Sequence, residues 1–183
     1  MSKKECVTET VKIEGFAPAR NAIKSAERWI AKANENPSED LNPQIDKFFS
    51  LYVSYNIIYS LISNEKNWDR CSAVNVISSY MKKNNITSFA TSKDDILKMI
   101  KPIRNHEIFH IYENNNDFKL ISNIDASIDV EESVLNLLYG IRCNMFHGQK
   151  ELISEQLLLL IPANTVLENL VISLIKSITK DWK

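Results

Sequence analysis

Residues 43–63 read PQIDKFFSLYVSYNIIYSLIS, and this stretch decides the fold class. Its apolar and aromatic side chains, from Phe48 to Ile62, lie around most of the circumference of a helix rather than along one face. A helix without a polar face is covered on several sides by other elements. We therefore predict a central helix over residues 43–63, against which the rest of the chain packs.

Further helices are predicted on both sides of this central one. Residues 17–34 carry apolar side chains at intervals of three and four, as in an amphipathic helix. Residues 68–83 form another and end in two lysines, which suit a helix C-terminus. A short helix is expected from Ser92 through residue 100, stopped near Pro102 because proline lacks the backbone donor.

The last third of the sequence also shows a helical period. One helix is predicted over residues 129–146, where acidic residues occupy the first turn. A final helix covers residues 163–180, with a regular apolar face. Pro162 either begins this final helix or kinks a longer one that starts near Ser154.

These patterns predict one all-α domain over residues 1–183. The expected architecture is a bundle of five or six helices, with a small β-hairpin insertion near residues 107–122, where two apolar runs flank an Asn-rich turn. A length of 183 residues suits a single domain with a full core. Three glycines and five prolines are too few for a many-turned β-sandwich or for a disordered chain.

Composition excludes several classes of protein. The formal charge of −1 offers no overall attraction to nucleic acid, so any such binding must come from a local site. The longest unbroken apolar run, residues 157–161, is far shorter than a membrane-spanning helix. We therefore expect no membrane-spanning segment and no membrane partner. The first residues lack the apolar stretch of a secretory signal. Three cysteines without a CxxC spacing argue against a disulfide scaffold or a zinc ribbon. We expect a cytoplasmic protein.

One candidate site is the HEIFH stretch at residues 106–110, which matches the H-E-x-x-H pattern of zinc proteases. His106 and His110 share a face, and one metal ion, only if this segment is a helix. On a strand the two side chains would stand roughly 13 Å apart. We prefer the interpretation that these are two surface or half-buried histidines, and we expect no bound metal.

The second candidate lies at the end of the helix predicted over residues 129–146. Leu135, Tyr139 and Phe146 form a second apolar line beside the core face, and Arg142 lies within that line, five positions before His147. A helix with two apolar faces needs two partners, one being its own core and the other a second subunit. The simpler alternative makes Arg142 a snorkelling or salt-bridged residue and His147 a polar helix cap.

The residues around this pair resemble the signature of the HEPN superfamily. That signature is an arginine, four to six residues and a histidine, often followed by a glycine and a nearby lysine. Residues 137–150, LLYGIRCNMFHGQK, match it with four residues between the arginine and the histidine. Residues 51–59, LYVSYNIIY, are similar to the aromatic, Asn-containing helix of these proteins. The resemblance covers about half of the chain. Arg104 and His110 also satisfy the Arg–His spacing, but they lie outside the strongly predicted helices.

The resemblance implies a dimeric helical bundle that acts as a metal-independent endoribonuclease and needs no cofactor. In that reaction the 2′-hydroxyl of RNA attacks the adjacent phosphate. His147 suits the proton transfers, and Arg142 can hold phosphate oxygens through two parallel hydrogen bonds. Asn144 would donate a further hydrogen bond or orient His147. Cleavage benefits from one base and one acid, so we expect a composite site across a homodimer interface lined by Leu135, Tyr139 and Phe146.

Many active members of the superfamily carry a polar residue, often Asn, directly after the arginine. Here that position is Cys143, and the asparagine follows at Asn144. This departure favours an alternative, a non-catalytic HEPN-like module that dimerises and binds a nucleotide, RNA or a partner protein. Small HEPN proteins also occur as toxins with an antitoxin partner or in phage defence, which would be a biological role for the same chemistry.

Overall fold

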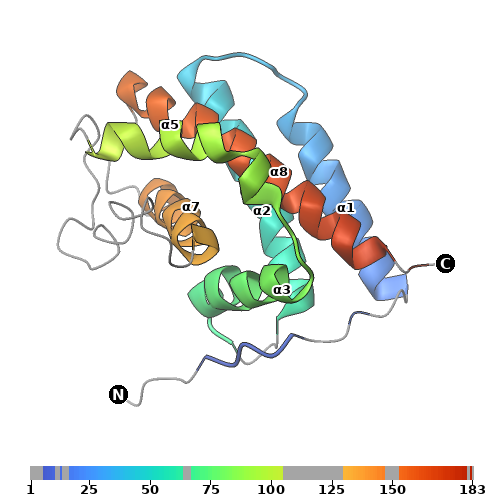
Figure 1. The fold of residues 1–183 in the computed structure, drawn as a ribbon. Helices are drawn as coiled ribbons and strands as arrows, with labels where there is room; N and C mark the ends of the chain where they lie inside the picture. Colours follow the sequence, from blue (N-terminus) through green and yellow to red (C-terminus); the bar gives the residue numbers. More distant parts are fainter. Residues whose placement is uncertain are drawn as a thin grey trace.

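The computed structural model describes residues 6–10, 13, 17–63, 67–104, 130–146, 153–180 and 182, and the account below concerns these residues. Every regular element among them is helical, which confirms the predicted all-α bundle (Figure 1). In chain order the elements are α1 (Ala17–Ala33), α2 (Leu41–Ile62), the π-helical segment η1 (Cys71–Val76), α3 (Ile77–Lys83), α4 (Ser88–Thr91), α5 (Lys93–Arg104), α7 (Val130–Phe146), the 3₁₀ turn η2 (Ser154–Gln156) and α8 (Leu157–Thr179). The hairpin expected at 107–122 lies outside the described residues.

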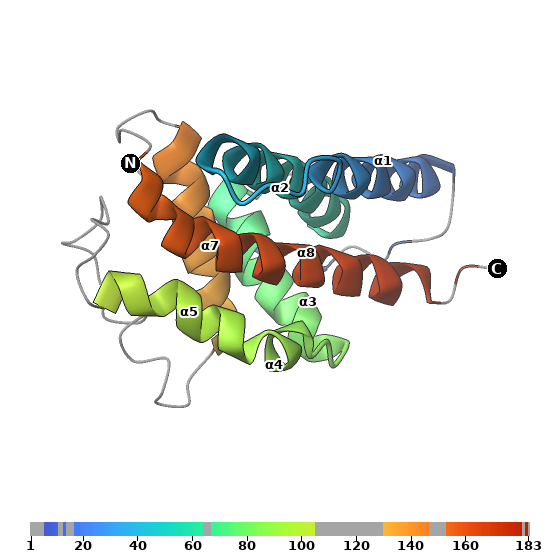
Figure 2. The same ribbon diagram turned by 90° about the horizontal axis from the view of Figure 1, so that it is seen from above.

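The helices pack around α2 and α8. Helix α8 crosses the molecule between α2 on one side and α5 on the other (Figure 2). Helix α1 packs along α2, whereas η1 and α3 pack against both α2 and α7. One continuous apolar core results, to which α2, α7 and α8 all contribute. This arrangement brings the middle of α2, the start of η1 and the end of α7 together.

The burial of α2 confirms that the 43–63 stretch forms a central helix. Phe48, Leu51 and Ile58 are each 0% exposed, and Tyr55 is 1% exposed. Buried side chains are distributed over most of the helix surface, because α1, α8 and η1 each cover a different side. Aromatic side chains thus lie in the interior along the length of α2.

Two prolines lie inside helices. Pro162 is in the first turns of α8, which η2 extends back to Ser154, so the longer of the two predicted alternatives is confirmed. Helix α5 continues past Pro102 to Arg104, and the predicted stop near that proline is therefore wrong. A proline in the last turn removes only one backbone hydrogen bond. Burial of Ile103, which is 1% exposed, favours continuing the helix.

The segment 154–179 corrects the expectation that no part of the chain is apolar enough to span a bilayer. It contains an 18-residue window with a mean hydropathy of 1.8, and by length and composition alone it would be able to cross a membrane. A short unbroken apolar run does not measure this property, because hydropathy is averaged over a longer window. Some 61% of that window is buried inside the protein, as in the core helix of a globular domain.

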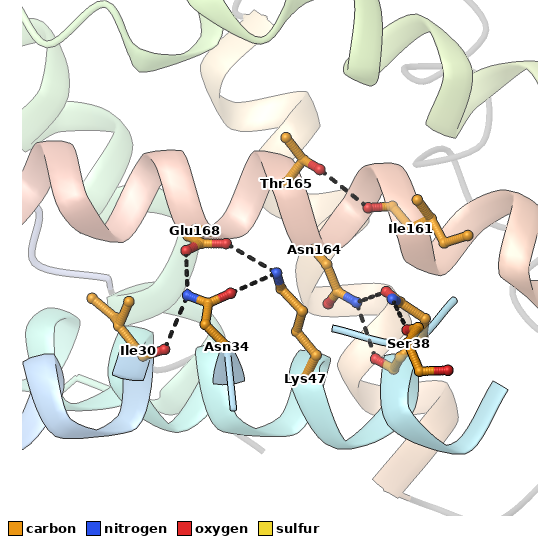
Figure 3. Close-up of polar contacts among 9 residues, drawn as sticks. Ile30, Asn34, Ser38, Lys47, Ile161, Asn164, Thr165 and Glu168 are labelled. Atoms are coloured by element: carbon orange, nitrogen blue, oxygen red, sulfur yellow. Dashed lines mark hydrogen bonds and ion pairs between the residues drawn. The ribbon is translucent and has the colours of Figure 1, made fainter. Parts of the chain in front are cut away.

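Polar pairs fix how α2 lies against α8 (Figure 3). The Asn164 amide, 2% exposed, donates from Nδ2 to the Gln44 backbone oxygen at 3.0 Å and to Gln44 Oε1 at 2.8 Å. Lys47 Nζ lies 3.2 Å from Glu168 Oε2 and donates to Asn34 Oδ1 at 2.8 Å. Buried polar groups are stable only when hydrogen-bonded, so a slip of one helix along the other would be unfavourable.

A disulfide joins Cys6 to Cys71, with 5.8 Å between the two Cα atoms. The argument from cysteine number and spacing did not anticipate this pair. An odd number of cysteines means only that they cannot all be paired. Here two form the disulfide, and the third, Cys143, is a buried free thiol. The bond ties the N-terminal residues to the start of η1, which is one border of the site described next.

Candidate functional site

The structure places Arg142 near the C-terminal end of α7, with 23% of its side chain exposed. Asn144 comes two positions later, about 200° around the helix from Arg142, and is half-buried. His147, and both histidines of the H-E-x-x-H match, lie outside the described residues. The site that the structure describes is therefore the surrounding of Arg142.

Helix α2 supplies three tyrosines to this region. Tyr52, Tyr55 and Tyr59 are spaced by three and four residues, so their side chains follow one side of the helix. The Tyr52 and Tyr55 rings meet edge to face with centroids 5.7 Å apart, and those of Tyr55 and Tyr59 do so at 5.2 Å. Such contacts stabilise aromatic pairs beyond simple burial. They form a rigid wall that faces α7 and η1.

Tyr55 also attaches α2 to the π-helical segment. Its hydroxyl donates a hydrogen bond to the backbone oxygen of Ala73 in η1. A π-helical segment shifts the backbone hydrogen-bond register, and such segments are frequent at functional sites. Since Asp69 stands just before η1, this contact helps to fix where Asp69 lies relative to the tyrosines.

Asp69 accepts hydrogen bonds from two tyrosines of different helices. The Tyr59 hydroxyl donates to Asp69 Oδ1 at 2.5 Å, and the Tyr139 hydroxyl of α7 donates to Asp69 Oδ2 at 3.1 Å. The two oxygens of a carboxylate can accept both bonds at once. Asp69 therefore bridges α2 and α7, although 42% of its side chain is exposed.

Arg142 lies against this carboxylate and two rings. Its Cζ is 5.9 Å from the ring centroids of both Tyr52 and Tyr139. Its Nη2 is 3.9 Å from Asp69 Oδ2, which is an ion pair but longer than a hydrogen bond. We call Tyr52, Tyr59, Asp69, Tyr139 and Arg142 the Arg142 site.

The electrostatics of the site keep its tyrosines protonated. Burial, reinforced by the negative charge of Asp69, raises the pKa of Tyr59 and of Tyr139 well above the ordinary value. Burial likewise raises the pKa of Tyr52 and Tyr55. These hydroxyls are therefore hydrogen-bond donors at physiological pH and not bases.

The charge of Arg142 is secure. Burial alone would lower the pKa of the guanidinium. Its contact with Cys143, at 3.8 Å between Nη1 and Sγ, and the nearby Asp69 outweigh that effect and raise the pKa. The site thus presents a permanent, partly exposed cation in a fixed orientation, which is suited to binding a phosphate or carboxylate.

The buried hydroxyl of Tyr52 is a further polar group of the site. Tyr52 is 2% exposed, and within the described part of the chain its hydroxyl has no hydrogen-bond partner. A buried donor without a partner is unfavourable, and it requires an explanation in terms of the function or of a bound polar group. Its neighbours are Arg142, Asp69 and the other two α2 tyrosines, as the electrostatic causes of its raised pKa indicate.

Sequence reasoning identified Arg142 but not its surroundings. Asp69 was missed, since nothing in its local sequence indicates a contact with Tyr139, 70 residues away. The α2 tyrosines were noted only as part of an aromatic helix, although their spacing gave a signal for a shared face. The simpler alternative for Arg142, a salt-bridged helix residue, agrees with the ion pair to Asp69.

The predicted dimer interface needs a correction at Leu135. This side chain is 1% exposed and belongs to the core of its own chain, so it cannot line a surface between subunits. A count along one helix assigned it to an outer line, but η1 and α3 also pack against α7, and Leu135 belongs to the common core. Tyr139 is half-buried and engaged with Asp69, and the Phe146 side chain lies outside the described residues.

Among the described residues no group of three or more His, Cys, Asp or Glu side chains is arranged to hold a metal ion. Comparison of the chain with models of protein families, with curated proteins and with solved structures found no match.

Proposed function

We propose that this chain is a metal-independent endoribonuclease of the HEPN type, in which Arg142 and His147 act on RNA. The observation that carries the proposal is the Arg142 site. A guanidinium is held near the end of α7 between two tyrosine rings, remains 23% exposed, and stands five positions before a histidine. A fixed and partly exposed guanidinium suits phosphate binding, and a histidine close in sequence is a candidate for the proton transfers.

In the proposed reaction RNA supplies its own nucleophile. The 2′-hydroxyl loses its proton and attacks the adjacent phosphorus, while the bond from phosphorus to the 5′-oxygen breaks. The products are a 2′,3′-cyclic phosphate and a 5′-hydroxyl. His147 would transfer the protons, because an imidazole titrates near neutral pH. Arg142 would stabilise the charge that develops on the phosphate, and Asn144 would donate a further hydrogen bond or orient His147.

Asp69 sets a condition on this proposal. A phosphate that binds Arg142 enters the field of a carboxylate whose Oδ2 is 3.9 Å from Nη2. The Tyr59 and Tyr139 hydroxyls fix the position of the Asp69 carboxylate. Asp69 therefore orients Arg142 through an ion pair that is longer than a hydrogen bond. We assign Asp69 the part of a positioning residue that also weakens anion binding.

The direct test is incubation of the protein with end-labelled single-stranded RNA in the presence of EDTA. Cleavage with 2′,3′-cyclic phosphate ends is expected, and EDTA should not reduce it. A matched oligonucleotide with 2′-deoxy sugars should remain intact because it lacks the nucleophile. His147→Ala should abolish cleavage. Inhibition by EDTA together with stoichiometric zinc would contradict the proposal and favour His106 and His110.

We further propose that the active form is a homodimer, because one chain offers a single histidine for two proton transfers. With Leu135 excluded, half-buried residues of α7 such as Tyr139, Gly140 and Asn144 are left for a partner. Sedimentation velocity at micromolar concentration should give a dimer. A monomer under these conditions that cleaves RNA at full rate would refute the composite site.

A second candidate function is a HEPN-like module that binds RNA or a partner protein without cleaving. The observation that favours it is Cys143, a buried side chain directly after Arg142, where active members often carry a polar residue. RNA retention without any cleavage would support this module. If cleavage is found, we propose a role as a toxin or phage-defence effector in the cytoplasm, with an antitoxin as a second partner.

A further inference from the structure

The N-terminal residues 6–10, here called the strap, are attached to the chain beside the Arg142 site. Cys6 forms the disulfide with Cys71, the first residue of η1. The Val7 backbone N–H donates to Asn67 Oδ1 at 3.1 Å, and Asn67 Nδ2 donates to the Val7 backbone oxygen at 2.7 Å. The strap is thus fixed to two positions, residues 67 and 71.

Asp69 lies between these two attachment points. Asn67 Nδ2 also donates to Ser63 Oγ at 3.1 Å, and Ser63 Oγ lies 2.8 Å from Ser72 Oγ. The strap, the end of α2 and the start of η1 therefore form one connected set of contacts around the Asp69 backbone. The direction of the Asp69 carboxylate toward Tyr59 and Tyr139 depends on that backbone.

The segment that carries Asp69 has little burial of its own. The Asp69 side chain is 42% exposed, and Trp68 is 44% exposed although it is a large apolar residue. Cys71, by contrast, is 0% exposed and is the covalent anchor of the segment. Besides the disulfide, hydrogen bonds hold this segment, from Tyr59 and Tyr139 to Asp69 and from Arg70 to Asn136. An exposed segment opens more readily than a core helix when one of its attachments is lost. The disulfide is thus the covalent constraint on where Asp69 stands.

We propose that the Cys6–Cys71 disulfide is a redox-sensitive latch on the Arg142 site: the oxidised bond holds Asp69 beside Arg142, and reduction releases the strap and loosens that contact. Its activity readout rests on the ribonuclease function proposed above. Protein thiols are kept reduced in the cytoplasm, the location proposed above, and a disulfide there is usually transient or redox-sensing.

The chemistry needs a dithiol reductant, the class to which thioredoxin-like proteins belong. One thiolate of the reductant attacks the sulfur of Cys6, the half-buried partner, and Cys71 leaves as a thiolate that takes up a proton. The second thiol of the reductant then displaces Cys6 from the mixed disulfide. Two electrons pass to the protein, which gains two thiols, while the reductant becomes a disulfide.

The latch is tested first without any substrate. Alkylation of the unfolded protein followed by mass measurement should find one free thiol in the oxidised form and three after dithiothreitol, since Cys143 is not in the disulfide. Hydrogen exchange should then show at least tenfold faster exchange of the amides at residues 67–72 in the reduced form. The amides of α8 should exchange equally in both forms. Equal exchange at 67–72 would overturn the proposal.

The second test measures RNA cleavage in the two redox states. Because Asp69 positions Arg142, we expect reduction to slow cleavage at least fivefold, and reoxidation to restore it. Faster cleavage after reduction would mean that Asp69 acts mainly by weakening anion binding, and it would refute the latch. Cys6→Ser should show the slow rate with or without dithiothreitol, and circular dichroism will verify that it is folded. Equal rates of the oxidised and reduced wild type would refute the latch and leave the ribonuclease proposal standing. Absence of cleavage in both states would refute the ribonuclease proposal, and hydrogen exchange alone would then decide the latch.

Discussion

Replacing Arg142 with lysine is expected to reduce the rate of RNA cleavage by about 10²- to 10³-fold, the usual effect of removing one group that stabilises transition-state charge. Lysine keeps the positive charge but lacks the planar fork that binds two phosphate oxygens at once. It also cannot lie flat between the rings of Tyr52 and Tyr139, each 5.9 Å from the guanidinium carbon. Single-turnover cleavage of a labelled RNA measures the effect.

Arg28→Lys is the matched control for this change. Arg28 is an exposed arginine of α1, a helix that contributes no residue to the Arg142 site. We have given it no role in the reaction, so its variant should cleave RNA at close to the wild-type rate. The melting temperature of Arg142→Lys should stay within a few degrees of wild type, because the ion pair with Asp69 is partly exposed. Full cleavage by Arg142→Lys would remove Arg142 from the mechanism.

The sequence was sufficient for the fold class because helical periodicity is a local property. The apolar surface of residues 43–63 predicted a buried helix, and α2 is buried on several sides. Residues 17–34 correspond closely to α1. The prediction failed at Pro102, where a local rule for helix ends gave way to the burial of Ile103 in the core. Whether a helix continues past a proline depends on tertiary packing, which a single sequence does not show.

The candidate site was only partly predictable for the same reason. Arg142 stood out because a charged residue interrupted an apolar line of one helix. Asp69 did not stand out, since its partners Tyr59 and Tyr139 come from two other helices. The pairing of Cys6 with Cys71 spans 65 residues and depends on how the N-terminal strap crosses the start of η1. Contacts between distant segments follow from the packing of the whole chain.

Leu135 was wrongly assigned to an outer surface because the periodicity of one helix was considered without its neighbours. The core face beside that surface, with Val134, Leu138 and Ile141, is buried as expected, and each of these side chains is at most 3% exposed. The angular count could not show that η1 and α3 would cover a second side of α7. Both elements lie within the helix that the sequence predicted over residues 68–83, but the pattern of one helix does not show where another helix packs against it.

The largest loss of stability is expected from Phe48→Ala. Phe48 is 0% exposed and stacks on Tyr52 with ring centroids 5.9 Å apart. Truncating a buried phenylalanine removes its transfer free energy and leaves a cavity, and together these lower the free energy of unfolding by about 3–5 kcal/mol. The total for a domain is roughly 5–15 kcal/mol, so the change removes a large share of it. Equilibrium denaturation in urea, followed by circular dichroism, measures the loss.

Phe49→Ala is the control, since it removes the same atoms one position along α2. Phe49 is only half-buried and packs at the border of the core, so its truncation should cost clearly less. Equal losses in the two variants would contradict the placement of α2. The pair also reports on the Arg142 site, because Phe48 supports Tyr52, and the Tyr52 ring lies under the guanidinium. Phe48→Ala should therefore impair RNA cleavage even under conditions in which it remains folded, whereas Phe49→Ala should not.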